Sequence, residues 1–349
     1  MRKRADSVVV VTGASSGIGR ATALAFARER ATVVLAARRA QALAEVAGQC
    51  DSLGGRALVV PTDVTEPLAV EDLARRAVES FGRIDVWVNN AAVTVFGRFE
   101  ETPPEAYRRV IETNLFGYIH GARAVLPTFR DQGSGVLINV GSMVAKLPQP
   151  YTSAYVISKH GVRALGMSLR QELLLAGAKD IHVCTVLPAT IDTPFFQHAA
   201  NFTGRGVKAM PPVYPAEQVA RTIVGLATRP RREVFVGRAG RMLNLQQMLA
   251  PGMTEGLLAR LVHDQHLDQN RPAEPTLGNL FEPDSQWTGV GGGWKPAGKG
   301  AGRTVALGLA AAVPGVLAWF WLRPRTRRLP ALNGRRPAGF RIPAKFPPV

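Results

Sequence analysis

Short apolar runs alternate with longer helical patterns over the first 240 residues of the chain. Several runs are nearly continuous in valine, isoleucine and leucine, as a strand buried on both faces requires. The predicted strands are 7–11, 32–36, 57–60, 84–88, 135–140, 181–187 and 233–236. The predicted helices are 18–30, 67–81, 104–130, 154–176 and 216–228. This alternation predicts a single α/β domain with a doubly wound parallel sheet of about seven strands, flanked by helices.

The alternation ends near residue 240, and the composition then changes three times. We predict an α/β domain over 1–245 and an extension over 246–303 that is first helical and then rich in proline and glycine. Residues 304–322 form a hydrophobic segment of nineteen residues without charge, and 323–349 form a basic tail rich in proline and arginine. The candidate chemistry falls in the first region, at strand ends, where such sheets bind ligands.

A glycine-rich turn, TGASSGIG, joins the first predicted strand to the first predicted helix at residues 12–19. Gly13 permits a tight turn, Gly17 lets a phosphate approach the backbone, and Gly19 lets the helix pack on the sheet. The helix that follows offers free N–H groups to a phosphate. This strand–turn–helix context predicts a Rossmann-type dinucleotide site. Its predicted binding residues are Gly13, Ser15, Ser16, Gly17, Ile18 and Gly19.

The end of the second predicted strand indicates which dinucleotide binds. An NAD site usually carries an acidic residue there to hold the ribose 2′-hydroxyl, but this chain has Arg38 and Arg39. A guanidinium pairs with a 2′-phosphate, whereas a carboxylate would repel it. Arg38 is therefore the predicted 2′-phosphate residue, and NADP(H) is favoured over NAD(H). The alternative is that both arginines are merely solvated at the start of the next helix.

Four polar residues form a candidate catalytic set. Tyr155 and Lys159 are four residues apart, so a helix places both side chains on one face. A tyrosine pKa of about 10 is too high for proton exchange at neutral pH, but a neighbouring ammonium stabilises the phenolate and lowers that pKa. Ser142 follows the fifth predicted strand, thirteen residues before Tyr155. Asn114 lies inside a predicted helix, although asparagine is a poor helix former.

The glycine turn and these four residues, in this order, resemble the short-chain dehydrogenase/reductase family over residues 5–240. The resemblance implies an oxidoreductase that moves a hydride between NADP(H) and an alcohol or carbonyl compound. It implies that Tyr155 is the general acid/base and that Lys159 lowers its pKa and binds the nicotinamide ribose. Ser142 would polarise the substrate oxygen, and Asn114 would hold a water in a proton relay to Lys159. A non-catalytic NADP-binding scaffold or redox sensor is the alternative, and the intact set speaks against it.

The same resemblance implies further cofactor contacts outside the glycine turn. They are Asp63 and Val64 at the adenine, Asn90 and Ala91 at the adenosine ribose, and Pro188, Ile191 and Thr193 in the segment at the nicotinamide carboxamide. Two glycines of the family pattern are alanines here, Ala92 and Ala189. Because alanine is the next smallest residue, we expect altered loop flexibility with catalysis retained.

The expected partners of this site are a small carbonyl or alcohol substrate and further copies of the chain. Segments 94–97, 143–150 and 195–213 are expected to line or cover the pocket, and they are largely apolar. An apolar lining favours a lipophilic secondary alcohol, ketone or aldehyde, and ordinary packing of a lid is the alternative. The predicted helices 104–130 and 154–176 match those that form the subunit interface in the family, which implies a homodimer or homotetramer.

The net charge of +17 does not define a nucleic-acid site. Ten basic residues and no acidic residue lie in 296–349, so residues 1–295 carry only +7 of this charge. The excess belongs to a tail, and aromatic–basic interleaving of the RNA-recognition kind does not occur. Nucleic acid is therefore disfavoured as a partner. Cys50 and Cys184 have no metal-ligand spacing, so we expect buried free thiols and no metal site.

Residues 304–322 reach the lower end of the length range for a transmembrane helix. Trp319, Phe320 and Trp321 cluster at one end, as interfacial aromatic residues do, and arginines follow. The N-terminus lacks the apolar stretch of a secretory signal, so the α/β domain is expected in the cytoplasm. A basic tail kept on the same side is incompatible with a single span, so we predict membrane association through 304–349 with the topology open. A helix docked on the domain or on a partner subunit is the alternative.

Overall fold

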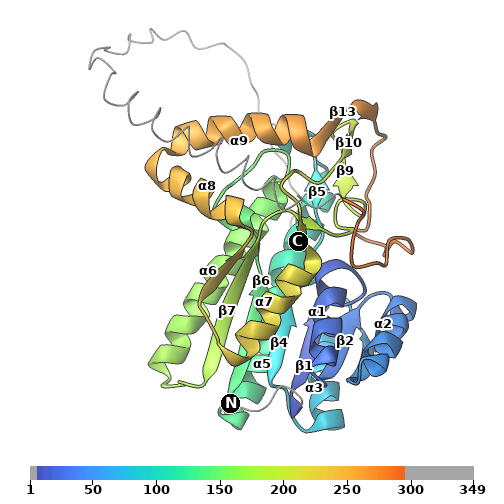
Figure 1. Ribbon diagram of the computed structural model, residues 1–349, viewed down its shortest axis with the longest axis vertical. Helices are drawn as coiled ribbons and strands as arrows, with labels where there is room; N and C mark the ends of the chain where they lie inside the picture. Colours follow the sequence, from blue (N-terminus) through green and yellow to red (C-terminus); the bar gives the residue numbers. More distant parts are fainter. Residues whose placement is uncertain (1–5, 295–349) are drawn as a thin grey trace, which may run out of the picture. The chain divides into compact units, whose positions relative to one another are not determined.

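The central sheet contains seven parallel strands in the order β12-β7-β6-β4-β1-β2-β3 (Figure 1). This computed structural model describes residues 6–294, without the side chains of 238–243, and all of these residues lie in the first of two units of the chain. The strands are β1 Val8–Thr12, β2 Thr32–Ala37, β3 Arg56–Pro61, β4 Val86–Asn89, β6 Gly135–Val140, β7 Ile181–Pro188 and β12 Glu233–Val236. The predicted doubly wound parallel sheet is confirmed.

Helices cover both faces of the sheet because alternate strand residues point to opposite layers. Val9 and Val11 belong to a core with α1, α2 and α7, whereas Val8 and Val10 belong to a core with α3, α5 and α6. These helices are α1 Gly17–Arg28, α2 Ala40–Ser52, α3 Pro67–Phe81, α5 Gly117–Gln132, α6 Ser153–Leu175 and α7 Ala216–Thr228. Cys50 and Cys184 are buried free thiols, as the sequence predicted.

The predicted helix 104–130 is interrupted. It consists of α4 (Pro104–Ile111), a π-helical segment at Glu112–Phe116, and then α5. The wider π turn is centred on Asn114, which is fully buried and hydrogen-bonded to the backbone of Val93. Such π segments are common at functional sites because they redirect one side chain without ending the helix.

The chain continues from β12 into two helices, α8 (Arg238–Leu249) and α9 (Pro251–His266), and the strand β13 (Leu267–Pro272). β13 pairs antiparallel with the short strand β10 (Arg205–Val207), which ties this extension to the loop after β7. Residues 273–294, here called the arm, follow β13 and run beside α1 and α2 (Figure 1). A composition rich in proline and glycine is typical of a loosely structured linker, but the arm makes many hydrogen bonds with the domain.

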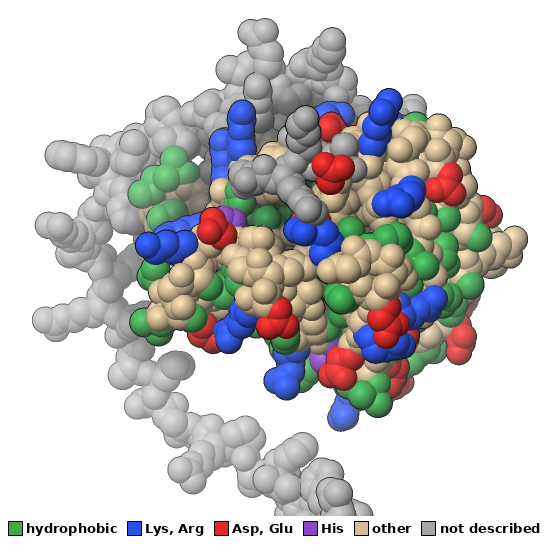
Figure 2. Space-filling model, turned by 90° about the horizontal axis from the view of Figure 1, so that it is seen from below, with side chains coloured by type: hydrophobic (Ala, Val, Ile, Leu, Met, Phe, Trp, Pro, Cys, Tyr) green, Lys and Arg blue, Asp and Glu red, His purple; other side chains and the backbone are tan. Residues whose placement is uncertain are grey.

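Acidic and basic side chains are interspersed on the face of the molecule seen in Figure 2, which suits an ordinary solvated surface. Within residues 6–294, no helix combines the length and the apolar character needed to cross a bilayer. The predicted hydrophobic segment 304–322 and the basic tail 323–349 lie outside the described residues.

Candidate active site

Ser142, Tyr155, Lys159 and Asn114 meet beyond the carboxyl end of β6. Ser142 follows that strand, Tyr155 and Lys159 lie in the first turns of α6, and Asn114 lies in the π-helical segment. Tyr155 is hydrogen-bonded to the side chain of Ser142, and Lys159 Nζ lies 5.6 Å from the centre of the Tyr155 ring. The structure therefore brings together the four residues that the sequence singled out. Ser142, Tyr155 and Lys159, whose catalytic roles are predictions, are called the catalytic corner below.

Lys159 is held by two acceptors inside the domain. Its Nζ donates to the carbonyl oxygen of Val140 at 2.9 Å and to the hydroxyl of Tyr118 at 3.1 Å. The Tyr118 hydroxyl in turn donates to the same carbonyl at 2.9 Å, and Lys159 Nζ lies 4.7 Å from the Tyr118 ring centre. Tyr118 was not predicted as a site residue. Its only signal in the sequence is an aromatic residue four positions after Asn114 in a helical pattern.

Burial shifts the pKa of both partners in the corner. It raises the pKa of Tyr155 to about 12, opposite to the lowering that the sequence predicted from Lys159, and only the hydrogen bond with Ser142 opposes that rise. It lowers the pKa of Lys159 to about 7. Near neutral pH, Tyr155 therefore keeps its proton while Lys159 is poised between its charged and neutral forms. In this state Tyr155 is suited to donate a proton to a substrate oxygen.

Asn114 links the π-helical segment to the loop after β4 and to α6. Its Oδ1 accepts from the backbone N–H of Val93 at 2.8 Å, and its Nδ2 donates to the Val93 carbonyl at 2.9 Å. Nδ2 also donates to the hydroxyl of Ser158 at 3.2 Å, and that hydroxyl donates to the Tyr155 carbonyl at 2.8 Å. Asn114 thus fixes the backbone that carries Tyr155. Its predicted part in a water relay to Lys159 stays a prediction.

The glycine turn has the shape that a dinucleotide needs. Gly13 and Gly17 adopt φ values of +66° and +54°, which favour glycine. A Cβ on Gly19 would lie 2.1 Å from the Gly13 carbonyl oxygen, so helix α1 approaches the turn this closely only because residue 19 is glycine. Asn90 Nδ2 donates to the carbonyl of Thr12 at 2.9 Å and holds the turn against the end of β4. The turn and Asn90–Ala91 are thus adjacent, and together they fit a bound nucleotide.

Asp63, the predicted adenine contact, is paired with a residue that the sequence did not suggest. Its Oδ2 lies 2.8 Å from Arg109 Nη2 on α4, and Thr65 donates to its Oδ1 through both its backbone N–H and its hydroxyl. Burial alone would raise the pKa of Asp63, but these hydrogen bonds and the Arg109 charge outweigh burial and lower it. Arg109 lies 46 positions from Asp63, and no spacing rule connects the two.

Arg38 and Arg39 follow β2, where the sequence placed the 2′-phosphate site. Arg39 Nη2 donates to the hydroxyl of Ser15 at 3.2 Å, so Arg39 adjoins the glycine turn. Burial lowers the pKa of both guanidinium groups. Both also donate to backbone carbonyl oxygens of the arm, which the sequence did not predict. The acceptors are those of Asn279, Leu280 and Phe281 for Arg38 and those of Asp284 and Gln286 for Arg39.

The end of β7 and the segment after it also meet the arm. They contain Pro188, Ile191 and Thr193, the predicted residues of the carboxamide end. The carbonyl oxygen of Thr193 accepts from Trp294 Nε1 at 3.2 Å. The residue types at the predicted site therefore suit a dinucleotide. Some of their hydrogen-bonding groups are bonded to the arm.

Aromatic residues form one wall beside Tyr155. The Phe195 ring lies 5.4 Å from the Tyr155 ring, and Phe196 packs edge-on against Phe195 at 5.6 Å. Met143 and Leu147, also expected at the pocket, are buried in a cluster with Leu258 of α9. Phe195 is thus the predicted pocket residue that the structure places against Tyr155.

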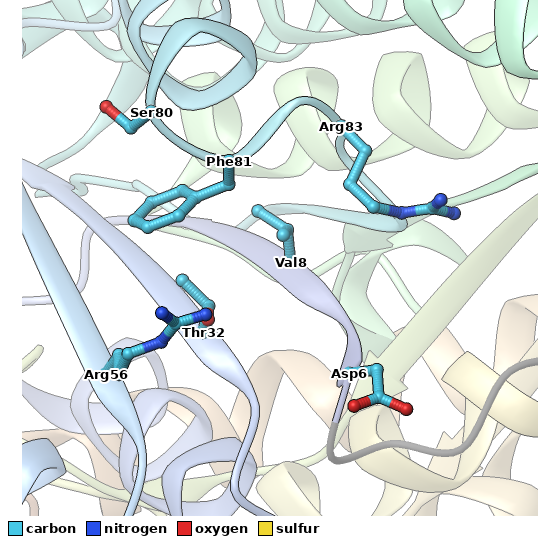
Figure 3. Close-up of a pocket in the computed structure, with 7 residues that line it drawn as sticks. All are labelled: Asp6, Val8, Thr32, Arg56, Ser80, Phe81 and Arg83. Atoms are coloured by element: carbon cyan, nitrogen blue, oxygen red, sulfur yellow. The ribbon is translucent and has the colours of Figure 1, made fainter.

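A separate pocket opens at the opposite end of the strands from the predicted site. Figure 3 shows it between the amino ends of β1, β2 and β3, with Arg56, Phe81 and Arg83 among its lining residues. It contains none of the predicted site residues, so we assign it no part in the chemistry. Among residues 6–294, no group of three or more His, Cys, Asp or Glu side chains could hold a metal ion.

Fold and site together define a nucleotide-binding α/β oxidoreductase. Comparison with known proteins identifies its family. A family model for short chain dehydrogenases matches residues 7–203. The uncharacterized oxidoreductase YxnA of Bacillus subtilis (strain 168) is 35% identical over 280 residues, covering 79% of this chain and 77% of that protein. The chain belongs to the short-chain dehydrogenase/reductase family and is an enzyme of the dehydrogenase type.

Solved structures agree with the fold. An alcohol dehydrogenase from the archaeon Thermococcus sibiricus, complexed with 5-hydroxy-NADP, has a TM-score of 0.59 at 28% identity, covering 66% of this chain and 95% of that one. A short-chain dehydrogenase/reductase from Burkholderia phymatum, in complex with NAD, has a TM-score of 0.67 at 24% identity, covering 79% and 99%. These neighbours hold an NADP derivative and NAD respectively, so they do not distinguish the two cofactors for this chain.

Proposed function

We propose that the protein is an NADP(H)-dependent oxidoreductase that interconverts a lipophilic secondary alcohol and the corresponding ketone, or an aldehyde and its alcohol, with Tyr155 as general acid/base. The observation that carries this proposal is the contact of Tyr155 with both Ser142 and Lys159. A buried tyrosine with an ammonium group beside its ring is the arrangement that proton transfer to a substrate oxygen requires.

In the reducing direction, Tyr155 donates its hydroxyl proton to the substrate oxygen and is left as a phenolate. The ammonium of Lys159 stabilises that phenolate, and Ser142 orients the substrate oxygen by a hydrogen bond. In the oxidising direction, the phenolate accepts the hydroxyl proton of the alcohol. When bound, the dinucleotide supplies or accepts the hydride. Asn114 supports this chemistry by fixing the first turn of α6 through Ser158.

The preference for NADP(H) rests on Arg38 and Arg39. The guanidinium of Arg39, beside the Ser15 hydroxyl, and that of its chain neighbour Arg38 provide charge-assisted donors for a 2′-phosphate. Neither residue is a carboxylate that would hold a ribose 2′-hydroxyl. The lipophilic substrate is supported by Phe195 and Phe196 beside Tyr155. We expect tighter binding of NADPH than of NADH, measured by titration of nicotinamide fluorescence.

The decisive test is Tyr155→Phe, assayed by NADPH oxidation against a panel of steroid, retinoid, fatty and aromatic carbonyls. We expect turnover to fall at least about a hundredfold, since general acid catalysis contributes that much, with NADPH binding retained. Tyr151→Phe is the matched control, because it removes one hydroxyl that bonds His263 outside the corner. An unchanged rate in Tyr155→Phe would refute the mechanism. A chain that binds NADPH but turns over no carbonyl would favour the scaffold or redox-sensor alternative.

Association with further copies and with membranes is proposed on separate grounds. Exposed apolar side chains at Phe116, before α5, and at Ile157, Met167 and Leu174 of α6 would suit a homodimer or homotetramer interface. Light scattering of the purified chain tests this. Membrane association is proposed for 304–349 from the sequence alone, and recovery of the native protein wholly in a low-salt, high-speed supernatant would contradict it.

A further inference from the structure

The arm lies against three groups of residues that serve the dinucleotide site. Its contacts reach Arg38 and Arg39 at the 2′-phosphate end, the glycine turn in the middle, and Thr193 at the carboxamide end. These groups follow the order in which the parts of a dinucleotide would meet them. The arm therefore follows the path of the cofactor along the carboxyl ends of the strands.

Both arginines donate to the arm, Arg38 through both of its terminal nitrogens and Arg39 through Nη1. Arg38 donates to three arm carbonyl oxygens at 2.6 to 3.2 Å, and Arg39 donates to two at 2.5 and 3.1 Å. A backbone carbonyl oxygen carries partial negative charge and so replaces a phosphate oxygen as an acceptor. A guanidinium has five N–H donors in a fixed fork, so the same N–H groups cannot serve the arm and a 2′-phosphate together.

The glycine turn is used in the same way. The backbone N–H of Gly17, at the start of α1, donates to the carbonyl oxygen of Gly289 at 3.0 Å. Arg20, in the first turn of α1, donates to the carbonyl oxygen of Thr288 at 2.7 Å. The N–H groups at the start of a helix are those that hold a phosphate in this fold. Here an arm carbonyl is the acceptor.

The end of the arm is seated between Asp192 and Thr193. Asp192 Oδ1 accepts the backbone N–H groups of Gly292 and Trp294, both at 2.9 Å. A Cβ on residue 292 would lie 2.3 Å from the Thr193 carbonyl oxygen, so the seat accepts only glycine there. The Trp294 ring packs edge-on against Phe196 at 5.8 Å, next to the aromatic wall beside Tyr155. The arm therefore spans the site from one end to the other.

We infer that the arm is an intramolecular competitor of the dinucleotide: the docked arm occupies the phosphate-binding donors, and NADP(H) binds when the arm leaves them. This inference rests on the proposed function, since it takes the dinucleotide to bind at the glycine turn. The apparent Kd is then the intrinsic Kd divided by the fraction of molecules with the arm undocked. NADPH and NADH are weakened by the same factor, so the arm sets affinity while Arg38 and Arg39 set the preference.

Gly292→Ala separates arm docking from the binding machinery, because residue 292 belongs to neither the turn nor the catalytic corner. The added methyl group cannot fit against Thr193, so the docked state is destabilised. We expect the Kd of both NADPH and NADH to fall by about tenfold, a shift in the docking equilibrium comparable to the loss of one hydrogen bond to a charged group. Gly289→Ala is the matched control, since its Cβ would meet the nearest atom at 3.4 Å, an ordinary contact. We expect its Kd values to stay within about twofold of the parent.

Trp294→Ala provides a second variant that leaves the α/β core untouched, with the half-exposed Trp287→Ala as its control. Hydrogen–deuterium exchange of residues 274–294 in the full chain gives a readout independent of turnover. We expect these amides to lose protection when NADPH is added. Increased protection would overturn the inference and would mean that the arm closes over a bound cofactor. An unchanged or raised Kd in both Gly292→Ala and Trp294→Ala would also overturn it and would mean that the docked arm does not compete with the cofactor. Failure of parent and variants alike to bind either dinucleotide would instead refute the proposed function.

Discussion

In the catalytic corner, the hydrogen-bond partners belong to the α/β domain itself, whereas at the phosphate-binding end they belong largely to the arm. Lys159 is fixed by Val140 and Tyr118, both within the domain, and it is almost completely buried. Arg38 and Arg39 remain partly exposed and bond to carbonyl oxygens about 240 residues further along the chain. The two ends of one site are thus assembled from local and from distant parts of the chain.

This difference separates the residues that determine turnover from those that determine cofactor binding. The corner is preorganised, because its donors and acceptors are already paired with neighbours that do not need to move. The phosphate-binding end is paired with a replaceable segment, so its affinity depends on an equilibrium in addition to its contacts. Substitutions in the corner should therefore change turnover, and substitutions at the other end should change binding.

Ser142→Ala should have the largest effect in the present comparison. It removes the hydroxyl that bonds Tyr155 and orients the substrate oxygen, so we expect kcat to fall about a hundredfold, as for loss of one oxyanion donor. The Kd of NADPH should stay unchanged, because Ser142 makes no contact with the arm or the glycine turn in our assignment. Ser168→Ala, an exposed position on α6, is the control. A weaker NADPH affinity with unchanged kcat would remove the distinction between the two ends.

Arg38→Ala should change the binding of the two cofactors to different extents. NADPH loses a partner for its 2′-phosphate, and the preference for NADPH over NADH should fall about tenfold, since a hydrogen bond to a charged group is lost. NADH has no 2′-phosphate to lose, and it should bind more tightly because the arm loses three hydrogen bonds. Arg28→Ala, at an exposed position on α1, is the control. An equal loss of affinity for both cofactors would show that Arg38 does not discriminate between them.

The catalytic corner could be predicted from the sequence because its spacing is imposed by regular elements. Tyr155 and Lys159 are one helical turn apart, and Ser142 directly follows a strand, β6, that packs beside that helix. The seven strands could also be predicted from the sequence, because a strand buried on both faces needs continuous apolar residues. Tyr118 could not be found in this way, since its contact with Lys159 depends on how α5 packs near α6.

The contacts of the arm could not be predicted either, but the physical reason is different. Its contacts with Arg38, Arg39 and Gly17 are made by backbone carbonyl oxygens, which every residue has, so side-chain identity carries little signal. Its composition, rich in glycine and proline, is also that of an unstructured linker. Gly278 and Gly292 do show a requirement in hindsight, because a Cβ would collide with the His198 carbonyl oxygen at the first and with that of Thr193 at the second.

Lys159→Met tests the charge state of Lys159 through the pH dependence of the free energy of unfolding. It has the smallest expected effect of the substitutions discussed. Burial lowers the pKa of Lys159 to about 7 in the folded protein, while an unfolded lysine has a pKa of about 10.4. Between these values the unfolded state binds more protons, so raising the pH favours the folded state, and below about pH 7 the cost of charging Lys159 is fully present. The free energy of unfolding should therefore rise between about pH 7 and 8.5, by at most about 1.4 kcal/mol per pH unit for this one group.

Lys159→Met should lose that rise, because methionine does not titrate. Urea unfolding at several pH values would compare it with Lys179→Met, an exposed lysine that should keep the parent slope. The window ends before Tyr155 and the two cysteines contribute, since their pKa values are raised by burial and would lower stability only at higher pH. Parallel curves for the parent and Lys159→Met would mean that Lys159 stays charged in the folded state. In that case the ammonium would be available to the Tyr155 phenolate at every pH at which the enzyme works.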